Sequence, residues 1–380
     1  MNLLRVAVAC MALLAFSLRA EDVDPQNQAM RVMVLKVKEL NDKAANWVVD
    51  RFDMKEGTFG NSKTAKMPGV VGLNILALQE MNRHYRIADG PFISEPMKYL
   101  AKAQDEDGSF GGKEFGNGSY NTSLALTAMA KTESALYEKN VEKARKYLEK
   151  CQAKDGGFSY GPKDPQGGDL SNTWFALRAL KLSGEKPDSE RFKKAGEFVR
   201  KCQDNPETNP ELNAVRSTNS GGAYYKPGVS EAGTLTARDG HSIPKPYGAM
   251  TAAAIESLAM CGLDAKSPEI AAALKWISTN YTVKDSAGLG QEGYYYYTMA
   301  LARALSAAGV KEITLPDGRK VLWAMELATQ LLSLQKPDGS FVNTEPRWLE
   351  NDPLIATSYA IISLAICREE LKKYSGAGDD

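Results

Sequence analysis

The sequence predicts an all-α protein in which six helical hairpins close into a ring with two concentric helical layers. Three observations lead to this fold class. The phrase Q-x-x-D-G-x-F occurs three times, a second and apolar pattern follows each copy, and the units are spaced by roughly 50 residues. Repetition at a fixed period is typical of a protein built from stacked supersecondary units.

The Q-x-x-D-G-x-F phrase begins at Gln104, Gln152 and Gln335. An amphipathic helix is expected before the copies, for example over residues 141–151 and 321–334. The Gln at the helix end can bond loose backbone groups, Asp-Gly favours a turn, and the Phe is expected to fill the gap between units. The phrase therefore indicates the fold more than any activity.

The apolar pattern T-x-x-A-L-x-x-L marks a second helix in each unit. Clear copies begin at Thr122, Thr173, Thr251 and Thr357, and weaker copies begin at Thr298 and Val71. Offsets of 0, 3, 4 and 7 place these side chains on one stripe of a helix, and the Thr is expected to cap the first turn. Six such units favour a closed ring, and an open solenoid is the alternative.

The overall charge bears on the binding partners, and the first 20 residues bear on the compartment. The chain has 47 basic and 47 acidic side chains, which argues against a general nucleic-acid or anionic-membrane binder. Residues 1–20 combine a basic start, an apolar run and Ala20, which predicts a signal peptide and hence a periplasmic or extracellular protein. An uncleaved anchor helix is the alternative. Residues 21–375 are then the ring and 376–380 a disordered tail.

Four cysteines remain after the predicted cleavage, and they fall at equivalent positions of the repeats: Cys151, Cys202, Cys261 and Cys367. Equivalent positions on neighbouring units lie about 8 to 10 Å apart, which is farther than a disulfide allows. We expect free, buried thiols that serve as small core side chains.

The connections between helices alternate in length. The long ones lead from an outer helix to an inner helix, so they emerge on the same rim of the ring, which makes that rim the candidate functional face. The longest spans residues 203–248 and carries Asp239, His241 and Tyr247, which we expect to form a lid over the cavity mouth. A solvent-exposed excursion is the alternative.

Helical phase predicts which side chains face the lumen. Trp174 and Tyr359 fall on the face opposite the packed stripe, and Tyr294 lies at the start of its helix. One register of that face carries charged residues, namely Arg178, Glu256 and Arg303. These six residues are the predicted ligand-binding set. A mutually neutralising ion-pair cluster is an equally open interpretation of the three charges.

Two stretches of the sequence resemble the repeats of known families. Residues 143–158, with Gln152, Gly156 and Phe158, resemble the QW motif of squalene and oxidosqualene cyclases, with Phe in place of the final Trp. Residues 152–184 are similar to the internal repeats of protein prenyltransferase β subunits. The resemblance covers nearly all of the mature chain. It implies an (α/α)6 toroid whose central cavity, in those families, holds isoprenoid chains.

The chain departs from the catalytic patterns of both families. Prenyltransferase β subunits bind zinc through Asp, Cys and His, and this sequence has Glu292, Tyr294 and Ala356 at the matching positions, so we expect no metal and no cofactor. Squalene-type cyclases use D-x-D-D-T, and residues 169–173 read D-L-S-N-T. Asp169 is therefore a weak catalytic candidate, and a helix cap is its alternative role.

The expected function is binding of an apolar or isoprenoid-type small molecule, or of a protein or glycan partner, at the long-loop rim of a monomer. Two enzymatic alternatives remain open. One is a divergent terpene cyclase-like enzyme, and the other is a carbohydrate-active α/α-barrel enzyme that uses two carboxylates. The candidate rim carboxylates are Asp169, Asp239, Glu292, Glu345 and Asp352.

Overall fold

The computed structural model describes residues 24–132, 134–212, 217–236 and 240–376. The predicted signal peptide over residues 1–20 and the predicted lid residue Asp239 lie outside these ranges. Within them, no helix is long and apolar enough to cross a membrane.

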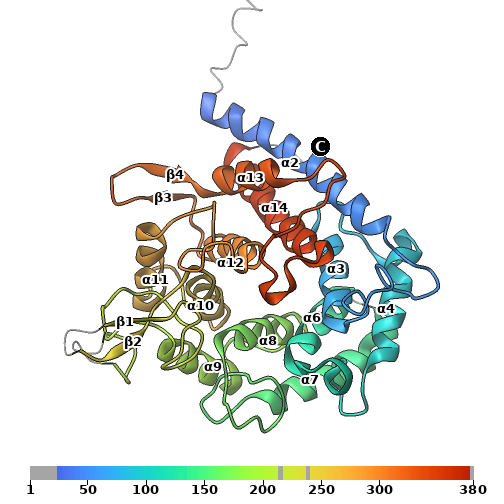
Figure 1. The fold of residues 1–380 in the computed structure, drawn as a ribbon, viewed down its shortest axis with the longest axis horizontal. Helices are drawn as coiled ribbons and strands as arrows, with labels where there is room; N and C mark the ends of the chain where they lie inside the picture. Colours follow the sequence, from blue (N-terminus) through green and yellow to red (C-terminus); the bar gives the residue numbers. More distant parts are fainter. Residues whose placement is uncertain (1–23, 133, 213–216, 237–239, 377–380) are drawn as a thin grey trace, which may run out of the picture.

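Six inner helices form a closed ring around the centre of the molecule (Figure 1). They are α3 (Pro68–Glu80), α6 (Gly118–Ala130), α8 (Leu170–Leu182), α10 (Gly248–Met260), α12 (Tyr294–Ala307) and α14 (Pro353–Ser375). Each packs on the next, and α14 packs on α3, so the ring is closed and is not an open solenoid. Because neighbours contact these helices on several sides, they are apolar around most of their circumference.

Six outer helices surround this ring, and each buries one stripe against it. They are α2 (Pro25–Val49), α4 (Pro91–Ala103), α7 (Glu138–Cys151), α9 (Glu190–Lys201), α11 (Pro268–Thr279) and α13 (Trp323–Leu334). In α9, for example, Phe192, Ala195 and Val199 are buried while Lys193 and Lys194 are exposed. The predicted all-α fold of six helical hairpins is therefore confirmed.

The connections contain a few short elements. They include α5 (Gly112–Phe115) and the 3-10 helices η1 (Ile87–Asp89), η2 (Ala135–Tyr137) and η3 (Arg347–Leu349). Two antiparallel hairpins were not predicted from the sequence. Strand β1 (Thr234–Thr236) pairs with β2 (Ser242–Pro244), so that Thr234 lies opposite Pro244, and β3 (Glu312–Thr314) pairs with β4 (Lys320–Leu322), so that Glu312 lies opposite Leu322.

The repeated Gln forms a bridge between neighbouring units, which we call the glutamine bridge. Gln152 Nε2 donates to the carbonyl of Gly156 in its own turn and to the carbonyl of Arg191 at the start of the next outer helix, both at 2.9 Å. Gln104 and Gln335 make equivalent pairs of bonds. The Phe of each phrase is fully buried, as expected. The phrase thus joins successive outer helices around the ring.

The repeated Thr has a different role from the one expected. Thr173 lies inside the first turn of α8, and the cap is Asp169, whose carboxylate accepts the backbone N–H of Asn172. The Thr173 hydroxyl accepts the backbone N–H of Phe158 at 2.9 Å and donates to the Asp169 carbonyl. The expected cap was wrong because the Thr is needed to tie the turn of its own unit to the inner helix.

The fourth unit contains a hidden copy of the same arrangement. Gln203 Nε2 donates to the carbonyls of Gly221 and Glu269, both at 2.8 Å, and the backbone N–H of Ala223 donates to Thr251 Oγ1 at 2.9 Å. In the sequence, residues 204–220 separate this Gln from this Gly. The bridge therefore survives an insertion that hides the phrase in the sequence.

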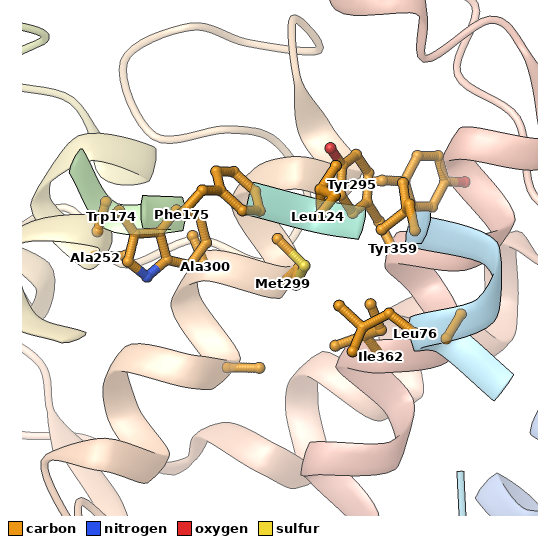
Figure 2. Close-up of a cluster of buried hydrophobic side chains, with 14 of the residues drawn as sticks. Leu76, Leu124, Trp174, Phe175, Ala252, Tyr295, Met299, Ala300, Tyr359 and Ile362 are labelled. Atoms are coloured by element: carbon orange, nitrogen blue, oxygen red, sulfur yellow. The ribbon is translucent and has the colours of Figure 1, made fainter. Parts of the chain in front are cut away.

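The middle of the lumen is filled by packed side chains. Figure 2 shows Trp174 and Phe175 from α8 close to Met299 from α12, with Leu76 and Ile362 nearby. The ring centroids of Trp174 and Phe175 are 4.8 Å apart. We call Trp174, Phe175 and Met299 the aromatic plug. Within it, Trp174 contacts the ring of Tyr296 and donates its indole N–H to Glu256.

The four cysteines of the described chain are free thiols, as predicted. Cys151, Cys202 and Cys367 are buried, whereas Cys261 is partly exposed because it follows the last residue of α10. Burial raises the pKa of the Cys151 thiol to about 12, so this thiol stays protonated at neutral pH.

Candidate functional site: a tyrosine-lined cavity at the rim

A cavity of about 330 Å3 lies at the rim from which the long loops emerge. It is formed at the N-terminal ends of the inner helices. Apolar side chains from four of these helices line its wall, namely Val70, Leu73, Leu124, Ala249, Met250 and Ile355. A volume of this size is at the lower end of the roughly 300–1,000 Å3 that holds small-molecule ligands.

Six tyrosines also line the cavity: Tyr120, Tyr160, Tyr225, Tyr247, Tyr296 and Tyr359. Most of their hydroxyls are paired within the wall. Tyr120 bonds Tyr359 and Tyr160 bonds Tyr225, each at 2.7 Å, and Tyr296 bonds Ser171 at 3.0 Å. Because these hydroxyls satisfy one another, the wall presents mainly ring surface to the cavity.

The aromatic plug packs against two of the tyrosines that line the cavity, Tyr120 and Tyr296. The ring of Tyr296 contacts Trp174 edge-on at 5.6 Å and Tyr359 at 6.0 Å, and Tyr120 contacts Phe175 at 4.8 Å. Edge-to-face contacts at these distances are favourable. Burial raises the pKa of Tyr120 to about 12, so its hydroxyl stays neutral. This part of the wall is therefore uncharged, since burial raises the pKa of Tyr296 and Tyr359 as well.

Three glutamates reach the cavity, and two of them share one arginine. Arg347 donates to Glu292 at 2.5 Å and to Glu231, and its guanidinium lies 4.3 Å from the ring centroid of Trp348. Glu231 belongs to the long loop of the fourth unit and Glu292 to the loop before α12. Arg347 therefore ties three rim segments together and is itself neutralised.

The third glutamate, Glu350, is buried at the N-terminus of α12. Its carboxylate accepts the backbone N–H groups of Tyr295 and Tyr296, at 3.1 and 2.7 Å, and the side-chain amide of Asn343 at 2.8 Å. Burial raises the pKa of Glu350 even though these bonds favour the charged form. Its first role is to cap α12 and to hold the η3 loop against it.

Two apolar side chains of η3 lie at the cavity mouth. Trp348 and Leu349 are 47% and 44% exposed and both line the cavity. Their φ angles are 56° and 63°, a conformation that costs non-glycine residues free energy. A Cβ on Gly293 would lie 2.9 Å from the Trp348 ring, so the close approach of this ring requires glycine there. The loop is therefore held in an unusual conformation at the mouth.

Asp169 lies next to the cavity and does not line it. Its side chain is almost fully buried and accepts both the backbone N–H and the side-chain amide of Asn172, each at 2.8 Å. Burial raises the pKa of Asp169. Ser171 and Asn172, which stand at the other two acidic positions of D-x-D-D-T, do line the cavity.

An ion cluster occupies the opposite end of the lumen. Arg178 pairs with Glu256, which also accepts the indole N–H of Trp174 at 2.6 Å. Glu80, the last residue of α3, faces Arg303 and Lys131 at 3.4 Å and Arg178 at 3.7 Å. Burial alone would raise the pKa of Glu80, but the three cations together lower it to about 2. The cluster links α3, α8, α10 and α12 with Lys131, the residue that follows α6.

Comparison with known proteins identifies the fold family. Residues 168–293 and 294–377 match the prenyltransferase alpha-alpha toroid domain, and residues 93–205 match the squalene-hopene cyclase N-terminal domain. The first match covers more than half of the chain. The chain belongs to the prenyltransferase alpha-alpha toroid family. A search of curated proteins by sequence found no match.

Solved structures with the toroid fold include terpene cyclases and mannanases. A variant of the type II terpene cyclase MstE from Scytonema, bound to merosterolic acid A, is 14% identical with a TM-score of 0.56, over 89% of this chain and 99% of that one. An inactive variant of an α-1,6-mannanase of Salegentibacter sp. HEL1_6, bound to α-1,6-mannotriose, is 13% identical with a TM-score of 0.56, over 88% of this chain and 99% of that one. At these identities the likeness shows the fold alone.

The toroid distributes the predicted ligand-binding residues over three levels. Tyr359 lines the rim cavity, Trp174 lies in the aromatic plug, and Arg178, Glu256 and Arg303 lie in the ion cluster. Tyr294 is buried away from the cavity, and its hydroxyl donates to the Val283 carbonyl at 2.7 Å. Helical phase predicts which face of a helix points inward. It does not predict how far along the lumen each inward side chain lies.

The predicted lid residues also separate. Tyr247 is buried and lines the cavity, whereas His241 is exposed next to β2 and does not line it. Among the candidate carboxylates, Glu292 lines the cavity, Asp352 caps α14 through the backbone N–H of Leu354, and Glu345 is exposed. The long fourth-unit loop thus contributes Tyr225, Glu231 and Tyr247 to the site.

Several cavity residues were not predicted from the sequence, notably Tyr120, Glu231 and Glu350. Tyr120 and Tyr296 each lie two residues before the repeated Thr, and that offset was available in the repeat alignment. Glu231 and Glu350 lie in irregular loops, where no periodicity marks them. Among the described residues, no group of three or more His, Cys, Asp or Glu side chains is placed to hold a metal ion.

Proposed function

We propose that this protein binds an uncharged, mainly hydrocarbon small molecule of the isoprenoid type in the rim cavity. The observation that carries the proposal is the wall itself. Aliphatic side chains such as Leu73 and Ile355 alternate with tyrosine rings whose hydroxyls are largely paired with one another. Such a wall offers dispersion contacts and ring surface, which suit a hydrocarbon chain better than a polyhydroxylated sugar.

The charges of the site support an uncharged ligand. Three glutamates reach the cavity, and the rim arginine that touches two of them, Arg347, is already neutralised by Glu231 and Glu292. A diphosphate or carboxylate ligand would face these acidic groups without a cation to receive it. Binding of an isoprenoid that carries an anionic group is therefore disfavoured in this cavity.

We further propose that the reactions of the related families are not retained. Ser171 and Asn172 stand in place of the acidic pair of D-x-D-D-T, and Asp169 caps a helix. Glu292, Tyr294 and Ala356 stand in place of the zinc ligands, and Tyr294 points away from the cavity. The terpene cyclase bound to merosterolic acid A supports a small-molecule ligand within this fold.

The remaining parts of the proposal concern the setting. We propose that residues 1–20 direct export to a periplasmic or extracellular compartment and that the mature chain works as a monomer.

A glycan-cleaving enzyme is the second candidate function. Glu231 and Glu292 both bind Arg347 and so lie near each other, and Trp348 is exposed at the mouth. A binding experiment separates the two ligand classes.

The experiment measures binding of geranylgeraniol and of α-1,6-mannotriose to the mature chain by tryptophan fluorescence and calorimetry. The variant Ala249→Phe fills the cavity, because Ala249 is buried and lines it. Ala271→Phe, on the exposed face of α11, is the matched control. We expect wild type and Ala271→Phe to bind geranylgeraniol and Ala249→Phe to lose binding at least tenfold.

Two results would contradict the proposal. Binding of mannotriose with loss in Ala249→Phe would assign the cavity to a glycan. Binding of geranylgeraniol that is equal in wild type and in Ala249→Phe would place the apolar ligand elsewhere on the molecule.

A further inference from the structure

A second cavity, of about 290 Å3, lies between the end of α11 and the long loop of the fourth unit, and we call it the outer pocket. Among the described residues, it shares none of its lining with the rim cavity. Its side chains include Thr218, Ser220, Leu235, Lys245, Trp276 and Asn280. Most of these come from the long loop, so the insertion that hides the repeated phrase builds a separate cavity.

Trp276 carries the buried donor of this pocket. The other buried tryptophans donate their indole N–H groups to a carboxylate or a carbonyl, namely Trp47, Trp174 and Trp323. Trp276 is only 7% exposed, yet its indole N–H has no partner among the described residues. Its Nε1 is not fully enclosed by protein, so a group in the outer pocket can reach it. A donor that is largely withdrawn from water is unfavourable without a partner, and this N–H therefore marks a position for a ligand acceptor.

Lys245 places a positive charge in the same pocket. It is the only charged side chain among the described lining residues, and its ammonium group has no carboxylate partner within this part of the chain. The side chain is partly buried, so its charge is only partly screened by water. An unpaired ammonium group in the same pocket as an unpaired indole N–H favours an anionic group that accepts hydrogen bonds from both.

The pocket also contains hydrogen-bond acceptors. The hydroxyls of Thr218 and Ser220 both donate to Asp204 Oδ2, the latter at 2.7 Å, so they present only lone pairs to a ligand. Asp204 itself is 3% exposed and does not line the pocket. Asn280 Nδ2 donates to the Trp276 carbonyl at 2.9 Å, which leaves Asn280 Oδ1 as a further acceptor. These oxygens are suited to receive hydroxyl groups of a ligand.

We propose that the outer pocket binds a small hydroxylated carboxylate of about the size of a uronic acid. Its carboxylate accepts hydrogen bonds from Lys245 Nζ and Trp276 Nε1. Its hydroxyl groups donate to Thr218, Ser220 and Asn280. The outer pocket is separate from the rim cavity, so this inference goes beyond the proposed function and does not depend on it.

The test follows the indole N–H signals of the isotope-labelled mature chain by NMR while glucuronate or glucose is added. The two probes share their ring hydroxyls and differ at one carbon, which is a carboxylate in glucuronate and a hydroxymethyl group in glucose. The chain has five tryptophans, and Trp276→Phe identifies the Trp276 signal. We expect glucuronate to move this signal and to bind roughly tenfold more tightly than glucose, because charge-assisted hydrogen bonds are the stronger ones.

Three variants locate the carboxylate. Lys245→Met keeps a long side chain and removes the charge, so the preference for glucuronate is expected to fall roughly fivefold. Lys284→Met removes the charge of an exposed lysine that does not line the pocket, and it is expected to leave the preference unchanged. Trp276→Phe keeps an aromatic ring and removes the indole donor, so binding of glucuronate, measured from backbone amide signals, is expected to weaken roughly tenfold.

Four results would overturn the inference. Glucose and glucuronate could move the Trp276 signal equally, which would show that no carboxylate is recognised. Lys284→Met could reduce the preference as much as Lys245→Met, which would indicate general charge attraction. Glucuronate could move the Trp348 signal in place of the Trp276 signal, which would put the ligand in the rim cavity. Finally, neither probe could move the Trp276 signal, in which case water satisfies the indole N–H. The binding of geranylgeraniol is measured separately, so each of these results leaves the proposed function standing.

Discussion

Glu80 is the residue that balances the far end of the lumen. It faces Arg178, Arg303 and Lys131, while Glu256 pairs with Arg178. Burial lowers the pKa of Arg303, because desolvation disfavours its charged form. Charges in such surroundings are tolerated only when each of them has an oppositely charged partner. The three charged residues predicted to share one register thus form part of a larger ion network. Its further carboxylate is Glu80, at the end of α3, which the register did not include.

Replacing Glu80 with Gln is expected to destabilise the fold by about 3 kcal/mol, because breaking a buried pair leaves uncompensated cations. The free energy of unfolding from urea titration at neutral pH measures the effect. Glu142→Gln is the matched control, since the pair of Glu142 with Lys146 is 63% exposed on both sides and such pairs contribute little. Equal effects of the two variants would show that the cluster is solvated and not buried.

The same carboxyl predicts a pH dependence. The folded pKa of Glu80 is about 2 against an ordinary value of 4.5, so ionised Glu80 stabilises the folded state. This stability is fully present above the unfolded pKa and is lost as the pH falls toward 2. The difference in urea midpoint between wild type and Glu80→Gln should therefore shrink between pH 5 and pH 2. A constant difference over that range would contradict a lowered pKa.

At the scale of elements, the turn after each outer helix is as constrained as the helices. Gly156 has a φ of 94°, and a Cβ there would lie 2.3 Å from the carbonyl oxygen of Lys194 in the next unit. Gly108 meets the carbonyl of Lys143 in the same way. The glycine of the repeated phrase is thus needed both for the turn and for the close approach of the following outer helix.

Gly156→Ala is expected to destabilise the protein by about 3 kcal/mol or more, since the clash adds to the cost of the left-handed conformation. Gly184→Ala separates these two effects. Its φ is 101° but no atom lies within 4 Å of the added Cβ, so a cost of about 1 kcal/mol is expected. Thermal unfolding of both variants measures the difference. Similar costs would show that the contact with Lys194 relaxes easily.

The repeats predicted the helices but not the arrangement of the fourth unit or the β1–β2 hairpin. Repetition predicted the inner and outer helices, because the Gln, Gly and Phe of the phrase make the same contacts wherever they recur. In the fourth unit the insertion between Gln203 and Gly221 hides the phrase although the bonds persist. The β1–β2 hairpin was missed for a similar reason, since its strands are three residues each and carry no alternating pattern.

At the scale of the whole molecule, the sequence predicts the rim and leaves the cavity undetermined. Loop lengths place the long connections on one face, and that face holds the cavity. The depth at which each inward side chain lies depends on how six helices pack, so Arg178 and Tyr359 fall at opposite ends of one lumen. Glu231 and Glu350 come from loops whose path is set by tertiary contacts with Arg347 and with the start of α12.

Ring closure makes the stability of this fold collective. Helix α14 packs on α2, α3, α12 and α13, so removing the sixth unit would expose inner faces of α3 and α12 together. A linear solenoid tolerates loss of a terminal repeat because each unit contacts only its neighbours. A chain ending at residue 322 is therefore expected to lack a cooperative unfolding transition and to aggregate.

A circular permutant is the matched contrast, because it cuts the chain but keeps every unit. The ends of the ring lie close together, since Arg31 Nε donates to the carbonyl of Ser375 at 3.2 Å. A short glycine linker can join residue 376 to residue 24, and new ends can open between Asp317 and Gly318 at the exposed tip of the β3–β4 hairpin. We expect this permutant to unfold cooperatively with a stability within about 2 kcal/mol of wild type, measured by urea titration and circular dichroism.

If the truncated chain folds as well as the permutant, the sixth unit is dispensable and closure adds little to stability. If only the permutant folds, the hairpins hold together because the ring is complete, whatever the position at which the chain begins.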